Sequence, residues 1–312
     1  MIEKIREIAK NWLAEGKVDV VIGFGEGTTP FSAKPIFITK PDDVEKLIWN
    51  PLCRLNLAGY VRREILAGRK VGVVAKGCDS RSIGLLLAEK QFDRKDVSII
   101  GVPCQGMVDR KTLMKKFGNV NGEKVSADWN SISVGDKSIS TEEVLSDACR
   151  ICRYPTPVHY DELVGEKIEG VSIEEHDKPA VEMLEKNRED RWKFYTEHFG
   201  RCIRCYACRQ ACPTCYCDEC FVDSNDPKWL EKGQHPTDLM LWNLGRIYHQ
   251  VGRCVECGSC ESVCPMDIPF TEILAGMSKR VRELYDYESG IAVDEPPPLQ
   301  TFKTDDPQEF IM

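Results

Sequence analysis

Two cysteine runs with the same spacing carry the chemistry that this sequence could perform. In residues 202–212 and 254–264, three cysteines are each separated by two residues, a fourth follows after three more, and a proline comes next. With this spacing, three thiolates wrap one face of a [4Fe–4S] cluster, while the fourth points away and binds a second cluster. The sequence therefore predicts two [4Fe–4S] clusters with crossed ligands, one held by Cys202, Cys205, Cys208 and Cys264 and the other by Cys254, Cys257, Cys260 and Cys212.

Two other uses of cysteine compete with this interpretation. Eleven of the 16 cysteines lie between residues 202 and 264. Disulfides belong to oxidising compartments, and the charged N-terminal segment lacks the apolar core and cleavage site of an export signal. A structural zinc site uses two Cys-x-x-Cys pairs and does not need four cysteines in one run. Clusters bound by reduced thiols are therefore favoured.

The sequence does not assign a role to several residues near the first run. Cys215, Cys217 and Cys220 follow it and either serve a further cluster or remain free or packed thiols. Cys53, earlier in the chain, also has no assigned role. Three arginines lie in or directly before this run, beside the first cluster, and either raise the cluster potential, dock an acidic partner or are simply solvated: Arg201, Arg204 and Arg209.

The cysteine-rich region resembles a known type of domain. The sequence CPTCYC follows the first run, and CPMDI ends the second. Both are similar to the dicluster ferredoxin domain of sulfhydrogenase β subunits and of the anaerobic sulfite reductase A subunit, over about residues 185–285. The resemblance implies a domain that relays electrons between a flavin or nicotinamide subunit and a distal catalytic centre.

A third set of cysteines is scattered through the first half of the chain. VGVVAKGC and VSIIGVPC each place a cysteine just after a buried strand, and ACRIC supplies a close pair. The ends of neighbouring parallel strands meet at one edge of a sheet, where helix N-termini favour the negative charge of a thiolate cluster. These cysteines either form a third [4Fe–4S] site or are two buried thiols and a separate redox or zinc pair: Cys78, Cys104, Cys149 and Cys152.

Residues 40–160 resemble the β subunit of the deazaflavin-reducing hydrogenases and their formate dehydrogenase relatives. In that family, cysteines at these places bind one [4Fe–4S] cluster beside a flavin, so the resemblance implies a third cluster and an FAD. The chain lacks the family's glycine-rich N-terminal segment. Its own glycines, Gly23, Gly25 and Gly27, do not fit a dinucleotide fingerprint; after a strand, they form either a turn for a flat or phosphorylated ligand or an ordinary loop.

Hydrophobic periodicity predicts an α/β domain with a small mixed or parallel sheet, followed by a mainly α domain of the two-cluster ferredoxin type. The predicted helices are residues 1–15, 42–66, 80–90, 180–198 and 271–287, the predicted strands are 17–24, 71–75 and 97–102, and 131–140 is a hairpin. The α/β domain spans residues 1–165, and 166–198 form a linker and a helix. The two-cluster domain spans 199–288. Residues 289–312 are an acidic, proline-containing tail that wraps a partner or frays.

Composition narrows the function classes. The net charge of −8 disfavours nucleic acid, and no apolar run is long enough for a membrane span. We therefore expect a cytoplasmic iron-sulfur subunit that relays single electrons within an anaerobic multi-subunit redox complex of the hydrogenase, formate dehydrogenase or heterodisulfide-reductase-linked kind. Its partners would be flavoprotein, hydrogenase or dehydrogenase subunits. The alternatives are a flavin-binding subunit that exchanges hydride with a nicotinamide or deazaflavin, and a zinc-stabilised scaffold. No catalytic residue is predicted.

Overall fold

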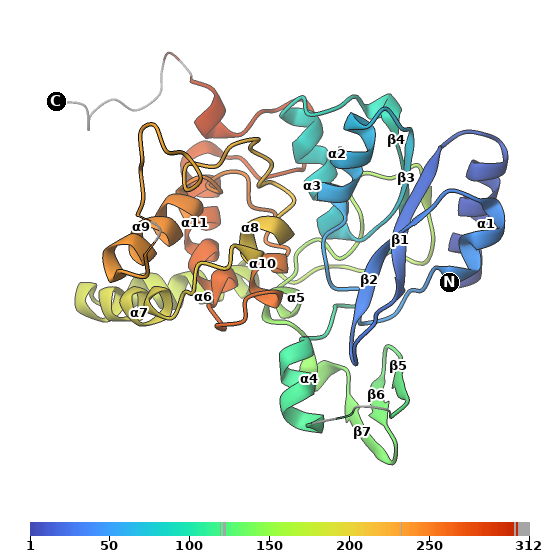
Figure 1. Cartoon of the computed structure of the whole chain (residues 1–312), viewed down its shortest axis with the longest axis horizontal. Helices are drawn as coiled ribbons and strands as arrows, with labels where there is room; N and C mark the ends of the chain where they lie inside the picture. Colours follow the sequence, from blue (N-terminus) through green and yellow to red (C-terminus); the bar gives the residue numbers. More distant parts are fainter. Residues whose placement is uncertain (119, 121–122, 232, 303, 305–312) are drawn as a thin grey trace.

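The two halves of the chain fold around separate hydrophobic cores. The computed structural model describes residues 1–118, 120, 123–231, 233–302 and 304. Figure 1 shows the main sheet of the first half towards one end of the molecule and the helices of the second half towards the other. The predicted order, an α/β domain followed by a mainly helical one, is confirmed.

A five-stranded sheet in the order β2–β1–β3–β4–β8 forms the first domain. β2 pairs antiparallel with β1, and the other neighbours are parallel, so the sheet is mixed. The short apolar β3 is buried along its whole length, as expected for a central parallel strand whose two faces are covered. The strands are β1 (Val20–Glu26), β2 (Ala33–Ile38), β3 (Val71–Ala75), β4 (Val97–Gly101) and β8 (Glu162–Leu163).

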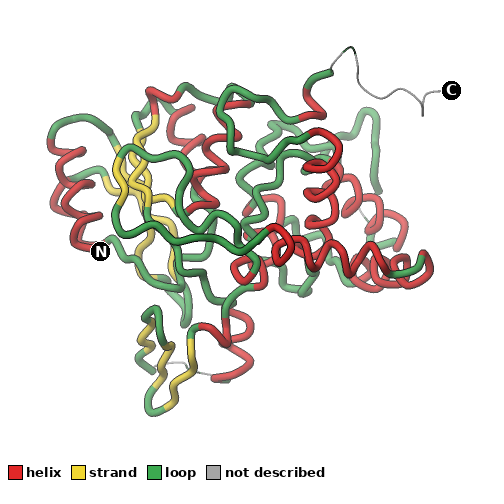
Figure 2. The backbone as a smooth tube through the Cα atoms, turned by 180° about the vertical axis from the view of Figure 1, so that it is seen from behind, coloured by secondary structure: helices red, strands yellow, loops and turns green. Residues whose placement is uncertain are grey.

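Helices cover both faces of this sheet. α1 (Ile2–Ala14) buries Ile5, Ile8 and Trp12 against it, because these residues recur at helical spacing on one side. Figure 2 shows the strands between α1 and the helices of the rest of the chain. The other helices of the domain are η1 (Pro41–Lys46), α2 (Ala58–Leu66), α3 (Gly77–Ala88), η2 (Arg94–Asp96), η3 (Glu142–Val144) and α5 (Asp147–Arg150).

A small lobe extends from the first domain (Figure 1). It combines α4 (Arg110–Phe117) with an antiparallel sheet of β5 (Val125–Ala127), β6 (Ser131–Val134) and β7 (Lys137–Ser140). Gly135 has φ 55° at the tight turn between β6 and β7, a conformation that glycine adopts without steric cost. The hairpin predicted at residues 131–140 is therefore confirmed.

Longer helices surround the cysteine runs in the second domain. α6 packs along α11, and α7 packs along α9. Each cysteine run contains one short helix, α8 or α10, and these two helices contact one another. The helices are α6 (Ile173–Glu185), α7 (Arg188–Gly200), α8 (Ala207–Ala211), α9 (Pro236–Tyr248), α10 (Ser259–Ser262) and α11 (Phe270–Tyr285), and η4 (Pro298–Gln300) follows.

Two predicted helical segments need correction. A single helix over residues 42–66 is wrong: only η1 and α2 are helical, and Pro51, which lacks an amide hydrogen, lies in the turn between them. A linker over 173–179 followed by one helix over 180–198 is also wrong. The Ser172 side chain accepts from the Glu175 amide and starts α6, and Asn187 caps α7, so two helices meet at residues 186–187.

The glycine-rich segment was placed after a strand, but Gly23 and Gly25 lie inside β1 and pair with β2. A Cβ at Gly23 would lie 2.5 Å from Cδ2 of Leu47, and one at Gly25 would lie 2.9 Å from Cγ2 of Ile36. Glycine is needed at both positions for close packing. The prediction that these two glycines form a turn or loop is therefore wrong.

Part of the C-terminal tail packs on this chain. The Ser289 carbonyl accepts from Nε of Arg81 at 3.1 Å, and the Gly290 carbonyl lies 3.0 Å from Nε2 of His159. A Cβ at Gly290, which has φ 75°, would lie 1.9 Å from the Arg81 carbonyl oxygen. The start of the predicted tail is thus seated on α3, while residues 303 and 305–312 lie outside the described residues.

Candidate metal centres

Four cysteines predicted to share a cluster line one small cavity in the second domain. The aromatic side chains of Trp242 and Phe270 line the same cavity. Three of its thiol residues are at most 9% exposed, whereas Cys205 is exposed. This first-run set consists of Cys202, Cys205, Cys208 and Cys264.

The second predicted set also lines one cavity, and its members come from both runs. Three belong to the second run, and Cys212 comes from the end of the first. The crossing arises because α8 and α10 lie in contact, so the last cysteine of each run is close to the other run. This second-run set consists of Cys254, Cys257, Cys260 and Cys212.

Both runs share a backbone geometry that fits a cluster. Arg204 and Tyr206 have φ near 52° and 57°, and the equivalent Glu256 and Gly258 have φ of 56° and 63°. Left-handed conformations are costly for residues with a Cβ and collect at functional sites. The Arg204 amide donates to Cys202 Sγ at 3.4 Å, and the Glu256 amide donates to Cys254 Sγ at 3.3 Å. Four thiols around one cavity, with amides directed at sulfur, suit a [4Fe–4S] cluster.

The scattered cysteines of the first domain meet around a cavity of about 250 Å³. Cys78 lies in the first turn of α3, directly after β3, and Cys104 follows the neighbouring β4. The Gly106 amide donates to Cys104 Sγ at 3.4 Å, as in the two runs. This first-domain set consists of Cys78, Cys104, Cys149 and Cys152. The four thiol groups of this set also fit a [4Fe–4S] cluster.

The first-domain cavity adjoins the second-run set, because Glu256 and Cys257 line both cavities. Arg54 joins the two walls: Nη1 donates to the Cys257 carbonyl at 2.7 Å and Nη2 donates to Ser146 Oγ at 2.9 Å. The cysteines Cys149, Cys257 and Cys78 raise the pKa of Arg54 against the opposing effect of its burial. A cation is thus held between two groups of thiols.

A buried ion pair also borders the first-domain cavity. Lys76 Nζ lies 2.8 Å from Asp79 Oδ2, with side chains 2% and 0% exposed, and donates to the Leu55 carbonyl at 3.0 Å. Burial alone would lower the pKa of Lys76, but Asp79 and Cys78 raise it. The amine therefore remains charged beside the thiols.

Arg246 on α9 is a buried cation that lies beside both cysteine runs. It is 2% exposed, and Nη2 donates to the Cys208 carbonyl at 3.2 Å. Burial opposes its charge, but Cys260, Cys208 and Cys212 raise its pKa. Its Nε and Nη1 are buried and have no hydrogen-bond partner among the described residues.

Burial raises the pKa of most of these thiols, to about 11 for Cys152 and about 12 for Cys260. The pKa of Cys212 shifts the other way, because a hydrogen bond with Cys215 lowers it well below the usual value. The positive charge of bound iron would favour thiolates at the raised sites, as metal ions do for coordinated thiols.

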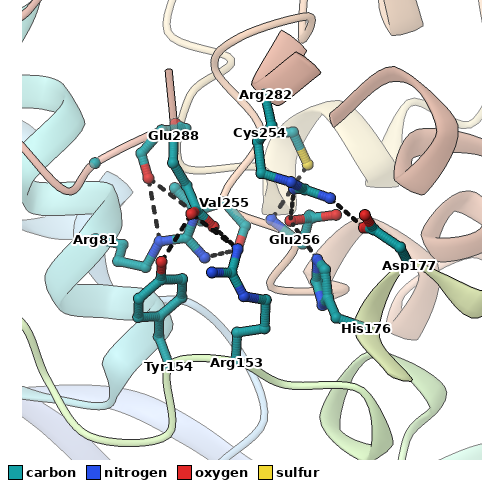
Figure 3. Close-up of polar contacts among 12 residues, drawn as sticks. Arg81, Arg153, Tyr154, His176, Asp177, Cys254, Val255, Glu256, Arg282 and Glu288 are labelled. Atoms are coloured by element: carbon teal, nitrogen blue, oxygen red, sulfur yellow. Dashed lines mark hydrogen bonds and ion pairs between the residues drawn. The ribbon is translucent and has the colours of Figure 1, made fainter. Parts of the chain in front are cut away.

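Polar contacts join the second run to α3, α6 and α11 (Figure 3). Glu256 accepts from Nε2 of His176 on α6 at 3.2 Å and lies 3.7 Å from Nη1 of Arg282 on α11. Arg81 on α3 donates through Nη1 to the Val255 carbonyl at 3.3 Å, so the Cys254–Cys257 loop contacts both domains. Nearby, Glu288 receives two hydrogen bonds from Arg153 and one from Tyr154.

A cavity of about 680 Å³ lies between α2, the segment after the first run and α9. Tyr60, Tyr216 and Phe221 contribute aromatic surface, and Arg62 and Arg63 contribute charge. The cysteines with open roles, Cys215, Cys217 and Cys220, line this cavity together with Cys212. Cys53 instead is packed in the core of the first domain.

The arginines near the first run have internal partners. Arg201 donates to the Asp267 carbonyl, Arg204 to the Gly233 carbonyl, and Arg209 pairs with Asp223 at 2.6 Å. The sequence reasoning missed Arg54, Lys76 and Arg246. Lys76 carried the one available signal, since it interrupts an apolar strand just before Cys78.

No three Cys, His, Asp or Glu side chains in the described ranges converge closely enough to bind a single metal ion. Among the helices of the same ranges, none has the length and apolar character needed to cross a membrane.

Known proteins resemble parts of this chain. Residues 198–268 match the 4Fe-4S dicluster domain family, which implies two [4Fe–4S] clusters. One chain of the F420-reducing [NiFe] hydrogenase complex from Methanosarcina barkeri shares 18% identity, with a TM-score of 0.38 over 48% of this chain and 58% of that chain.

Two curated relatives align along almost the whole chain, each at 25% identity. The F420-dependent formate dehydrogenase subunit β of Methanocaldococcus jannaschii is covered over 93% of its length and 94% of this chain. The F420-dependent formate dehydrogenase 1 subunit β of Methanococcus maripaludis is covered over 92% of its length and 95% of this chain. The chain is therefore homologous to these formate dehydrogenase β subunits and carries the 4Fe-4S dicluster domain of an oxidoreductase subunit.

Proposed function

We propose that this chain relays single electrons through three [4Fe–4S] clusters within a multi-subunit oxidoreductase. The observation that carries the proposal is the adjacency of the three thiol sets. Cys257 and Glu256 line the cavities of both the first-domain set and the second-run set. Each cluster, when bound, would accept and release one electron at a time.

The second step of the path lies between the two runs. α8 and α10 are in contact, and Arg246 lines the cavity of the second-run set and donates to the Cys208 carbonyl of the first-run set. This adjacency favours transfer inside the chain.

One end of the series reaches the surface. Cys205 is exposed, and the adjacent Ile203 is 50% exposed, so the first-run set is the natural contact for a partner subunit. The homologues are β subunits of F420-dependent formate dehydrogenases. We infer that this chain likewise works beside dehydrogenase or hydrogenase subunits and that its cluster ligands are the three sets of four cysteines described above.

Iron and acid-labile sulfide per chain, measured on anaerobically purified protein, test the relay. Three [4Fe–4S] clusters correspond to about 12 irons. Cys104→Ser and Cys205→Ser should each lower the iron content by about four. Cys217→Ser, at an exposed cysteine outside the three sets, is the matched control and should lose none. A wild-type content of about eight irons, unchanged in Cys104→Ser, would remove the first-domain cluster.

A second candidate function rests on the 680 Å³ cavity. Its size lies within the range of small-molecule sites, about 300–1,000 Å³, and its aromatic and basic lining suits a planar, negatively charged cofactor. Cys212 lines it, so a ligand there would lie beside the second-run set. In this reading the chain binds FAD and exchanges hydride with a nicotinamide or with a deazaflavin such as F420.

Fluorescence of acid-released flavin tests this second function on the same preparation. One flavin per chain that falls in Tyr216→Ala, but not in an exposed control such as Tyr160→Ala, supports it. No flavin in protein that contains its full complement of iron, even after incubation with FAD, rejects it and leaves the relay.

A further inference from the structure

We propose that Arg246 is a shared potential-setting residue, whose guanidinium raises the reduction potential of both clusters of the dicluster domain. The inference rests on those two clusters alone and does not require the first-domain cluster or a flavin.

The position of Arg246 between the two runs is the first observation. It projects from the buried face of α9, lines the cavity of the second-run set, and donates through Nη2 to the carbonyl of Cys208 in the other set. One side chain therefore lies against both sets.

The unused donors of Arg246 are the second observation. Nε and Nη1 are buried, and neither has a partner among the described residues. A buried N–H without an acceptor is destabilising, and more so when the group is charged. Sulfur atoms of bound clusters would provide the missing acceptors.

The charge of Arg246 is the third observation. Several other buried or partly buried cations have carboxylate partners: Lys76 pairs with Asp79, Arg253 with Glu89 and Arg282 with Asp177. Within the described part of the chain, Arg246 forms no such pair, and its guanidinium instead lies 5.0 Å from the centre of the Phe270 ring. A buried cation without an anion is strongly unfavourable, so an anionic group is expected beside it.

These features determine the effect on the clusters. Reduction adds one electron, and hence one negative charge, to a cluster without moving a proton. A positive charge in a poorly screened site stabilises the reduced form, and hydrogen bonds to sulfur act in the same direction. Because Arg246 adjoins both sets, removing its charge should lower both potentials together.

Potentiometric titration followed by electron paramagnetic resonance tests this on the full chain. In Arg246→Gln we expect both dicluster potentials to fall by at least 59 mV, the one-electron equivalent of a tenfold change in equilibrium constant. Arg6→Gln is the control, because Arg6 is 20% exposed and pairs with Glu3 and Glu45 on the far face of the sheet. It should leave both potentials unchanged.

Iron content is measured alongside, because Arg246→Gln could weaken folding. If that variant loses iron, Arg246→Lys is measured instead. Lysine keeps the positive charge but has fewer, differently placed N–H groups. This variant should therefore retain iron and show a smaller fall in both reduction potentials. The proposal is overturned if an iron-replete Arg246→Gln has unchanged potentials, or if only one cluster's potential falls. It is also overturned if Arg246→Gln loses iron and Arg246→Lys has unchanged potentials.

Discussion

Replacing Gly258 by alanine should destabilise the junction between the two domains. Gly258 lies between Cys257 and Ser259 with φ 63°. A Cβ there would lie 2.4 Å from Nη2 of Arg54 and 2.7 Å from Cβ of Ala148 on α5. Arg54 can shift only if it loses its hydrogen bond to Ser146 or to Cys257. The Cβ of Ala148 is attached directly to the backbone, so it can move only if α5 moves as well.

The magnitude follows from two terms. A left-handed alanine costs about 1–2 kcal/mol. Forcing a methyl group into a packed site costs about 1–3 kcal/mol more. The sum, about 2–5 kcal/mol, corresponds to a fall of roughly 4–10 °C in apparent unfolding temperature, at about 2 °C per kcal/mol for a chain of this size.

The assay is thermal unfolding of anaerobic protein at one fixed scan rate, because unfolding with loss of clusters is irreversible. Gly276→Ala in α11 is the matched control. A Cβ there meets no atom within 4 Å, and alanine in a helix gains about 0.5–1 kcal/mol over glycine. Adding Ala148→Gly to Gly258→Ala should recover part of the loss, since it removes one clash.

The reasoning would be refuted if Gly258→Ala unfolded at the wild-type temperature. It would also be refuted if Gly258→Ala changed the unfolding temperature by the same amount as Gly276→Ala. The first-run counterpart of Gly258 is Tyr206, which has a side chain at φ 57°. The requirement for glycine therefore comes from the neighbouring Arg54 and α5 and not from the cysteine motif.

Three further predictions concern buried charges. Burial lowers the pKa of His176, but Glu256 raises it above 6.5, so their contact stabilises the fold fully below about pH 6.5 and is lost as pH rises through the folded pKa. The difference in unfolding temperature between wild type and His176→Gln should therefore shrink with rising pH; a constant difference contradicts this. Asp79→Asn leaves the Lys76 ammonium buried without a carboxylate and should cost about 3–5 kcal/mol. The double variant Lys76→Met/Asp79→Asn should regain most of the lost unfolding temperature, and equal losses in both would contradict the charge argument. Glu288→Gln should weaken the contacts of the tail with the first domain, seen as faster proteolysis after residue 288, whereas an unchanged cleavage rate would show that other contacts hold it (Figure 3).

The sequence correctly predicted elements whose formation depends on residues close together in the chain. The strand over 71–75 and the hairpin at 131–140 lie where the hydrophobic periodicity and the turn residues place them. The predictions failed for elements whose formation depends on residues far apart in the chain. β2 was not predicted, since it is a half-exposed edge strand that pairs only with the glycine-containing β1.

The cysteine spacing by itself determined the dicluster domain and suggested which thiols belong together, because the motif contains its own turn geometry. Whether those thiols bind iron as three sets stays a prediction, although each set lines one cavity. Only the tertiary structure decided that the first-domain cavity shares Cys257 with the second-run cavity. It also placed Arg54, Lys76 and Arg246 beside the thiols. These cations come from separate helices and loops with no common spacing, so no sequence pattern could bring them together; the packing of α9 and α5 on the cysteine loops does.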